Sequence, residues 1–445
     1  TTRQRRLRRD PARVQREHAG PVSTTPAHTR GRIAIIGGSI AGLLAGLLLL
    51  RDKWDVRIYE RSGDELAGRG AGIAPHRALF DACALAGIDV EKTIGVESAG
   101  RTLLGRDGHV VASNEMRQLF TSWGLLYRSL RAVFPDERYH NGIGVREIHA
   151  TETGVRLTFD DDTGESADWV IGADGLRSLV RQTVAPDSEL RYAGYVAWRG
   201  LVIESKLPLA LRRQLERGMT FYVPENEHVL GYTVAGPNDT LVRGNRWYNW
   251  VWYRPLPTGP RLDATFTDDD GTQYRDGIPP PRIRRDVIDA LHADAATCLP
   301  PQFRSVVLAT EQPFLQPIVE LCSGQLVRDR CVLIGDAAFT ARPHIGLGVS
   351  KAAGDASSLS AAFATPDEDI PAALARWESA RLAYGRAAVA RGAALGCYIG
   401  DEPADDEQAR RHAHYRSAAV VLAEIAAEPA AEPDREPGIE QGPRQ

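Results

Sequence analysis

The hydrophobic positions of residues 33–60 predict a strand, a helix and a second strand in quick succession. Residues 33–36 are all apolar and indicate a short buried strand, the Ala- and Leu-rich residues 43–50 indicate a helix, and apolar positions 56, 58 and 59 indicate the second strand. A turn with the sequence GGSIAG, residues 37–42, joins the first strand to the helix, and the second strand ends at Glu60. This order predicts a βαβ unit built around a glycine turn.

Such a unit has the chemistry of a dinucleotide site. Glycines let the backbone turn sharply and approach a pyrophosphate at the helix N-terminus, and an acidic residue about 20 positions further on accepts from a ribose hydroxyl. Two other interpretations compete: a membrane helix over the uncharged residues 33–50, and a hydrolase nucleophile elbow over residues 37–41. A glycine turn after only four strand residues argues against the first, and the second leaves Glu60 unexplained.

Two later segments also run from an apolar strand into a glycine turn. Residues 169–181, WVIGADGLRSLVR, carry Asp174, and residues 331–348, CVLIGDAAFTARPHIGLG, carry Asp336 before a predicted helix over residues 349–364. A carboxylate at the end of a buried strand is costly unless it accepts hydrogen bonds, which suggests ribose or ribityl hydroxyls as partners. The glycine-rich loop again presents N–H groups at a helix N-terminus.

Residues 190–255 are rich in aromatic and β-branched side chains and predict a sheet. On the last strand, Trp247, Asn249, Val251 and Tyr253 share one face, and Tyr248, Trp250 and Trp252 share the other. We expect one face to cover the sheet and the other to line a flat aromatic pocket, although aromatic cross-strand pairs of an ordinary sheet core have the same pattern.

Composition indicates the size, the partners and the compartment of the protein, but not its chemistry. The chain has 445 residues, enough for two domains, and its net charge of −4 does not indicate a nucleic-acid partner. Five scattered cysteines show no zinc spacing, so we expect no metal and a reduced, cytoplasmic setting without a membrane. Residues 1–30 are Arg-rich; a disordered extension is favoured over a targeting or nucleic-acid arm.

The three segments, found in this order, resemble the FAD-dependent aromatic hydroxylases, a group of single-component flavoprotein monooxygenases. The resemblance covers residues 32 to about 395. It implies an α/β fold in which a Rossmann-like FAD-binding domain of the glutathione-reductase type is interleaved with a mixed β-sheet substrate domain. The implied FAD-binding domain spans residues 31–75, 100–183 and 310–365, and the substrate domain spans 76–99 and 184–309. A C-terminal helix spans 366–400, and a partly disordered tail spans 401–445.

The resemblance also assigns roles to individual residues. Phe339 departs from the family, which often has a histidine after GDAA, so that position offers no acid or base. The resemblance implies a catalytic place for Pro343. Because a phenol-like ring must lose a proton, Tyr222 and His344, with His228, are the candidates for proton transfer. The candidate substrate-binding residues are Tyr232, Trp247 and Asn249. The implied FAD contacts are Gly37, Gly38, Ser39, Ile40, Ala41, Gly42, Glu60, Arg61, Gly72, Ile73, Arg128, Val145, Asp174, Asp336, Gly346, Leu347 and Gly348.

The activity that the resemblance implies is hydroxylation of an electron-rich aromatic or heteroaromatic ring, such as a hydroxypyridine. NADPH or NADH would act as a transient donor and molecular oxygen would react through a C4a-hydroperoxyflavin, in an enzyme for which a homodimer is one candidate assembly. The alternatives are a flavin-dependent halogenase or another FAD oxidoreductase on the same fold, a non-catalytic flavin-binding protein and, last, a hydrolase. The ring, the donor, the catalytic base and the oligomeric state stay open.

Overall fold

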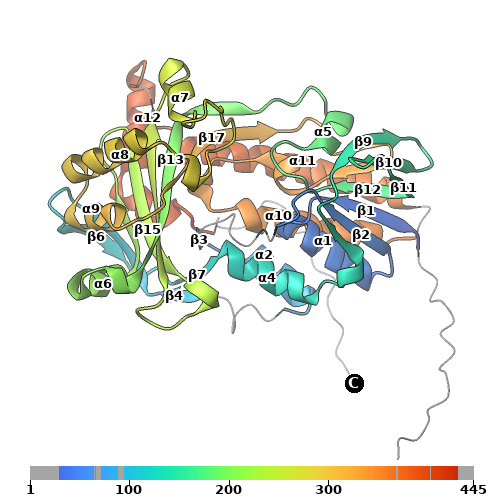
Figure 1. Cartoon of the computed structure of the whole chain (residues 1–445), viewed down its shortest axis with the longest axis horizontal. Helices are drawn as coiled ribbons and strands as arrows, with labels where there is room; N and C mark the ends of the chain where they lie inside the picture. The colour runs from blue at the N-terminus through green and yellow to red at the C-terminus, as the bar shows by residue number, and fades with distance from the viewer. Residues whose placement is uncertain are drawn as a thin grey trace, which may run out of the picture.

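A computed structural model describes residues 30–64, 66, 72–88, 95–366, 369–400 and 402–428, which form two large sheets bridged by helices (Figure 1). Residues 1–29 of the predicted extension and the part of the tail after residue 428 lie outside the described residues, as do residues 67–71 of a glycine-rich stretch. Helix α10 (Gly348–Phe363) lies between the two sheets, so the junction of the two bodies is helical (Figure 1).

The first sheet is the predicted dinucleotide-type body. Its six strands run in the order β18-β19-β12-β1-β2-β8, all parallel except the β18–β19 pair. Four of the five residues of β1 are fully buried, as expected for a central parallel strand covered on both faces. The strands are β1 (Arg32–Ile36), β2 (Asp55–Glu60), β8 (Tyr139–Asn141), β12 (Trp169–Gly172), β18 (Val327–Arg328) and β19 (Cys331–Leu333).

The second sheet has eight strands in the order β20-β17-β13-β16-β15-β14-β5-β6. These are β5 (Gly100–Leu104), β6 (Val110–Asn114), β13 (Arg191–Ile203), β14 (Gly218–Tyr222), β15 (His228–Val234), β16 (Trp247–Pro255), β17 (Phe314–Cys322) and β20 (Phe339–Thr340). Two small antiparallel sheets flank the large ones: β9 (Val145–Ala150), β10 (Val155–Phe159) and β11 (Gly164–Ala167), and β3 (Gly72–Ile73), β4 (Val96–Ser98) and β7 (Gln118–Ser122).

The remaining helices surround these sheets. They are α1 (Ile40–Arg51), α2 (Arg77–Leu85), α4 (Trp123–Val133), α5 (Leu179–Val184), α6 (Leu209–Leu215), α7 (Pro260–Thr265), α8 (Arg285–Cys298), α9 (Pro301–Leu308), α11 (Ile370–Leu395), α12 (Asp406–Arg416) and α13 (Ala418–Glu424). Among the described residues, no helix combines the length and the apolar character that crossing a bilayer requires. The membrane interpretation of residues 33–50 is therefore wrong, because a strand, a turn and the twelve residues of α1 share that stretch.

The two faces predicted for residues 247–253 are confirmed. Val251 and Tyr253 belong to one core, which faces the helical junction, whereas Tyr248, Trp250 and Trp252 belong to the core on the opposite side. The alternation follows from the strand period of two residues, and it decides which side chains of the large sheet can reach a site at the junction.

The structure divides the chain differently from the predicted domain boundaries at three places. Within the predicted FAD-binding stretch 310–365, β17 belongs to the eight-stranded sheet. Residues 100–114 form β5 and β6 of the eight-stranded sheet, because β5 pairs in parallel with β14. Helix α2 packs instead in the core of the first sheet, where Leu79, Ala82 and Cys83 are fully buried.

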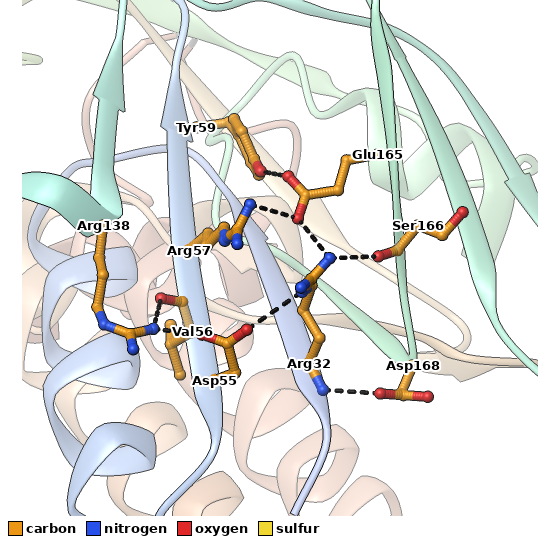
Figure 2. Close-up of polar contacts among 9 residues, drawn as sticks. All are labelled: Arg32, Asp55, Val56, Arg57, Tyr59, Arg138, Glu165, Ser166 and Asp168. Carbon is orange, nitrogen blue, oxygen red and sulfur yellow. Dashed lines mark hydrogen bonds and ion pairs between the residues drawn. The ribbon is translucent and has the colours of Figure 1, made fainter. Parts of the chain in front are cut away.

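A charged cluster ties strands β1 and β2 of the first sheet to the small sheet β9–β11 (Figure 2). The Arg32 guanidinium lies 3.2 Å from Asp55 Oδ2 and 3.0 Å from Glu165 Oε1, and Arg57 lies 2.8 Å from the same Glu165 oxygen. Arg138 forms a further ion pair with Asp55. Burial acts to raise the pKa of Asp55, but the hydrogen bonds and positive charges of Arg138 and Arg32 outweigh it and hold that pKa below its ordinary value.

The lowered pKa makes the contribution of Asp55 to stability depend on pH. Because the folded-state pKa lies below the unfolded value of about 3.9, this contribution is complete above that value and is lost as the pH falls through the folded pKa. We expect Asp55→Asn to lower the free energy of unfolding by about 1 kcal/mol at pH 7, measured as the urea midpoint, with a gap that closes below about pH 4.

Asp81→Asn is the matched control, because Asp81 makes only an exposed ion pair of 3.7 Å with Arg77. Its urea midpoint should equal that of the unaltered chain at both pH values. A gap for Asp55→Asn that stays constant down to pH 3 would contradict the assignment.

Candidate functional site

Two cavities meet at the junction of the sheets. The first, here called the turn cavity, has a volume of about 610 Å³ and is lined by the glycine turn, Glu60 and the ends of β12 and β19. The second, the sheet cavity, has a volume of about 430 Å³ and lies on the inner face of the eight-stranded sheet. The two share Trp123, Asp336, Gly348 and Val349, so that one elongated ligand can occupy both.

The glycine turn leaves no room for side chains. A Cβ on Gly42 would lie 2.0 Å from the carbonyl oxygen of Gly37, and one on Gly38 would lie 2.2 Å from the Tyr139 hydroxyl. Gly37 itself has a φ of +102°, in the region that favours glycine. No side chain caps the first turn of α1, which leaves backbone N–H groups directed at the turn cavity for an anion.

Glu60 shapes this turn as well as facing the turn cavity. Its buried carboxylate accepts from the backbone N–H of Gly38 at 2.9 Å and from that of Ser62 at 2.9 Å. Carboxylate oxygens have further acceptor sites, which suits a ribose hydroxyl. The predicted contacts Ser39, Ile40, Ala41, Arg61 and Val145 also line the turn cavity, whereas Gly38 and Gly42 lie behind the turn.

Asp174 lines the turn cavity, but its oxygens are already engaged by the chain. Oδ1 accepts from the Ser178 hydroxyl at 2.6 Å, and Oδ2 accepts from the N–H groups of Leu179 at 2.7 Å and Val180 at 3.3 Å. Burial raises the pKa of Asp174, although these hydrogen bonds act to lower it. The residue therefore fixes the start of α5 at the cavity wall.

The loop after β19 joins the two cavities. Asp336 faces both, and its Oδ1 lies 3.0 Å from the buried Nζ of Lys351 on α10. Gly346 adopts the left-handed conformation with a φ of +65° just before α10, whose first turn has no side-chain cap. Gly346 and Leu347 line the sheet cavity and Gly348 lines both cavities, as expected for a loop beside a flat ring.

Donor groups gather on the strand face that the sheet cavity exposes. Tyr232 and Tyr253 line it, and burial raises the pKa of Tyr232 to about 12, so its hydroxyl keeps its proton. Asn249 is fully buried; its Oδ1 accepts from Gly72 N at 3.3 Å while its Nδ2 has no hydrogen-bond partner. Gly72 and Ile73, both predicted cofactor contacts, line the same cavity.

Several predicted site residues lie elsewhere. Tyr222 packs on the opposite face of the eight-stranded sheet. Trp247 lines a third cavity of about 840 Å³, here called the rear cavity, which shares Asp276 and Gln316 with the sheet cavity. Arg128 does not line the turn cavity and is ion-paired with Asp239. The imidazoles of His344 and His228 lie behind the wall of the sheet cavity. His344 Nε2 lies 2.8 Å from the Tyr195 hydroxyl, and His228 Nδ1 lies 2.5 Å from the Tyr398 hydroxyl.

Burial sets the protonation state of this histidine pair. It lowers the pKa of His228 to about 3 and holds that of His344 well below the ordinary histidine value, so both imidazoles are neutral. Pro343 and Ile345 line the sheet cavity while His344 between them does not. The three-residue period of this 3₁₀ turn, Pro343–Ile345, turns the middle side chain away from the cavity.

Three residues at the site are not among those that the sequence predicts. Trp123 lines both cavities and stacks on Tyr127 at 5.2 Å between ring centroids. Asp355, buried on α10, accepts from Gly335 N at 2.9 Å and holds the turn that presents Asp336. Arg199 also lines the sheet cavity. The sequence YAGYVAWRG could have indicated this, because Arg199 follows Tyr195 and Ala197 at intervals of two residues and so shares their strand face.

The fold and the joined cavities define a dinucleotide-binding protein with a ring-sized chamber. The chain is 32% identical over 359 residues to 2,6-dihydroxypyridine 3-monooxygenase of Paenarthrobacter nicotinovorans, covering 81% of this chain and 89% of that protein. It is 28% identical to the 3-amino-4-hydroxybenzoate 2-monooxygenase PtmB3 of Streptomyces platensis, covering 80% and 85% of the two chains. The solved structure of 2,6-dihydroxypyridine-3-hydroxylase from Arthrobacter nicotinovorans superposes with a TM-score of 0.78 at 30% identity, covering 86% and 96%.

A family model described as FAD binding domain-like matches residues 192–320. Together these similarities show that the chain belongs to the FAD-dependent aromatic hydroxylases. It is an FAD-dependent monooxygenase, and neither the hydrolase nor the non-catalytic interpretation survives. The turn cavity fits the cofactor on its own geometry, because the collision at Gly42 and the uncapped start of α1 are what close approach of a pyrophosphate requires.

The collision at Gly42 gives a direct test of the turn cavity. In Gly42→Ala the new Cβ meets the Gly37 carbonyl oxygen, so the turn must shift at a cost of about 1–3 kcal/mol. We expect roughly 10- to 100-fold weaker FAD binding, measured by quenching of flavin fluorescence on titration of the apoprotein. Gly63→Ala is the control, since a Cβ there meets nothing within 4 Å. Equal affinity for both variants would show that the turn does not hold the cofactor.

Arg101 on β5 holds helix α13 and the residues after it beside the sheet cavity. This buried guanidinium donates to the carbonyl oxygens of Leu422 at 3.2 Å, Ile425 at 2.7 Å and Ala426 at 3.2 Å. Burial lowers the pKa of Arg101 to about 10, so the side chain stays charged at neutral pH. Ala426 lines the cavity and donates its N–H to the His344 carbonyl oxygen at 2.7 Å.

We expect Arg101→Met to release this end of the chain, because the Ile425 carbonyl oxygen loses its donor, at about 1–3 kcal/mol, while Leu422 and Ala426 each keep one side-chain donor, from Asn114 and Gln118. Limited trypsin digestion monitored by mass spectrometry should cut at Arg416 at least tenfold faster than in the unaltered protein. Arg117→Met, an exposed position near β7, is the control. Unchanged cleavage would show that other contacts hold the segment.

Proposed function

We propose that this enzyme hydroxylates a small, planar, electron-rich heteroaromatic or aromatic ring, with a hydroxypyridine as the first candidate. The observation that supports the proposal is the sheet cavity of about 430 Å³, which opens directly into the turn cavity. Its walls are flat side chains and the Pro343–Ile345 loop. The similarity to a dihydroxypyridine monooxygenase and to an aminohydroxybenzoate monooxygenase supports the same class of ring.

When bound, FAD supplies the redox chemistry that activates oxygen. We propose that Gly37, Ser39 and Glu60 hold its nucleotide part, and that Asp336 and residues 346–348 meet its ribityl chain and ring. The chain itself supplies position and dryness. Val251, Ile318 and Leu347 give the sheet cavity apolar walls that exclude water, and the hydroxyls of Tyr232 and Tyr253 are available to orient a ring oxygen.

We propose His344 as a positioning residue rather than the catalytic base. Its imidazole is neutral and lies behind the cavity wall, and its backbone is held by Ala426. Tyr222 is not proposed for catalysis, because it lies on the far face of the sheet. Pro343 keeps its proposed place, since its backbone stretch lines the chamber.

Three finer proposals complete this assignment. NADPH or NADH acts as a transient donor, and molecular oxygen as co-substrate. The enzyme works in the cytoplasm, which suits its five free cysteines. A homodimer is proposed from the exposed pair Val110 and Val111 on the edge strand β6, and light scattering after gel filtration tests it.

The decisive experiment is NADPH and NADH oxidation by the FAD-loaded enzyme with and without 2,6-dihydroxypyridine. We expect the ring to stimulate oxidation at least tenfold and to gain one oxygen atom, detected as a mass increase and labelled by ¹⁸O₂. 3-Hydroxybenzoate and uric acid form the comparison panel. Stimulated oxidation without a hydroxylated product from any of these rings would overturn the proposal.

A further inference from the structure

The charged groups of the sheet cavity are paired with one exception. Of the carboxylates, Asp336 is ion-paired with Lys351 and Asp276 with Arg177. Among the cations, Arg342 Nε lies 3.0 Å from Glu320. Within the described part of the chain, Arg199 is the charged residue of this lining that has no carboxylate partner.

Arg199 is held in place by uncharged contacts. It lies on β13 opposite Val251 of β16 and Phe314 of β17. One guanidinium nitrogen, Nη1, donates to Gln316 Oε1 at 3.3 Å, and the guanidinium carbon lies 5.7 Å from the centre of the Phe314 ring. Its Nε is buried without a hydrogen-bond partner. A half-buried cation with an orphaned donor is unfavourable unless something else completes it.

Several uncharged groups near Arg199 are able to donate a hydrogen bond. Among the described residues, neither the hydroxyl of Tyr232 nor that of Tyr253 makes a hydrogen bond, and Asn249 Nδ2 is buried without a partner. A Cβ on Gly72 would lie 2.8 Å from the Tyr232 hydroxyl and 2.9 Å from Asn249 Nδ2, so both surround that cavity-lining glycine. A cation without a carboxylate partner, with several donors close to it, complements an anionic acceptor.

We propose that Arg199 is the specificity-determining residue of the sheet cavity, and that its guanidinium receives a negatively charged oxygen of the ring, either a ring oxyanion or a carboxylate. This inference rests on the proposed function and names the residue that selects its substrate. The charge of Arg199 already acts on its neighbours: burial raises the pKa of Tyr232 and of Tyr253, and Arg199 is the positive charge that lowers both. The same field lowers the pKa of a ring hydroxyl in the cavity, so that the ring becomes electron-rich before oxygen transfer.

Other titratable groups near Arg199 do not reproduce this effect. Asp276 is ion-paired with Arg177 and Asp336 with Lys351. Arg342 is ion-paired with Glu320. Lys351 is buried against Asp336 and the Phe339 carbonyl oxygen. The neutral His344 and His228 lie behind the wall.

The test measures the dissociation constant of an aromatic ligand from the oxidised, FAD-loaded enzyme. The constant is read from the absorbance change of the bound flavin, with no nicotinamide present, so that the ligand does not react. We expect Arg199→Gln to raise the dissociation constant of 2,6-dihydroxypyridine roughly 10- to 100-fold, and Arg199→Lys to restore part of the affinity. 2,6-Dimethoxypyridine, which has no ionisable hydroxyl, should bind all three forms equally. Arg213→Gln, an exposed arginine on α6, is the control.

The pH dependence separates the two sources of charge. An oxyanion ligand should bind the unaltered enzyme more tightly as the pH rises through the pKa of its ring hydroxyl, and Arg199→Gln should remove that dependence. Benzoate, compared with benzamide, should instead show an Arg199-dependent affinity that is flat between pH 6 and 9. Retained flavin absorbance and an unchanged thermal midpoint show that the variants are folded.

If Arg199→Gln changes the affinity for both anionic rings less than twofold, the inference is overturned. Hydroxylation by the unaltered enzyme would then still support the proposed function. Arg199-dependent binding without hydroxylation of any ring would support the anion site and overturn the proposed function.

Discussion

The buried carboxylate of Asp355 is the contact on which the geometry of both cavities depends. It accepts from Gly335 N at 2.9 Å and from Arg381 Nε at 2.8 Å, so one side chain of α10 fixes the turn after β19 and helix α11 together. A buried charge is tolerated only when it is fully hydrogen-bonded, and removing one partner of such a pair typically costs about 3–5 kcal/mol. The position of Asp336, one residue after Gly335, follows from this contact.

Helix α10 connects this turn to the sheet cavity. Its first residues, Gly348 and Val349, line both cavities, and Lys351 one turn later meets Asp336. The backbone of this stretch is set from the other side by the bond between Ala426 N and the His344 carbonyl oxygen. A loop held from two directions is pre-organised for a ring, which a loop anchored only at its ends is not.

The features that could be predicted from the sequence are the local ones. The glycine turn and Glu60 are encoded within one βαβ unit, so neighbouring residues carry the whole signal. Strand alternation likewise predicts that Val251 and Tyr253 lie on the face opposite Trp250 and Trp252, because it depends only on the two-residue period of a single strand.

What could not be predicted depends on contacts between distant parts of the chain. Arg128 pairs with Asp239, 111 residues away, so its helix alone gave no sign of that partner. Tyr222 pairs in register with Val229, and this register, invisible in the sequence, turns it to the outer face. His344 faces away because residues 343–345 form a 3₁₀ turn instead of an extended loop.

The remaining rival on this fold is a halogenase, and Lys351 is the residue that bears on it. A halogenating lysine must present a free amine to an oxidised halide. The Lys351 amine lies 3.0 Å from Asp336 and also donates to the Phe339 carbonyl oxygen, and its side chain is almost fully buried. An amine engaged in this way stabilises the loop between the two cavities and is not open to a halide. The cavity therefore favours direct oxygen transfer to a bound ring, with Arg199 and the tyrosine hydroxyls as the polar groups left to meet that ring.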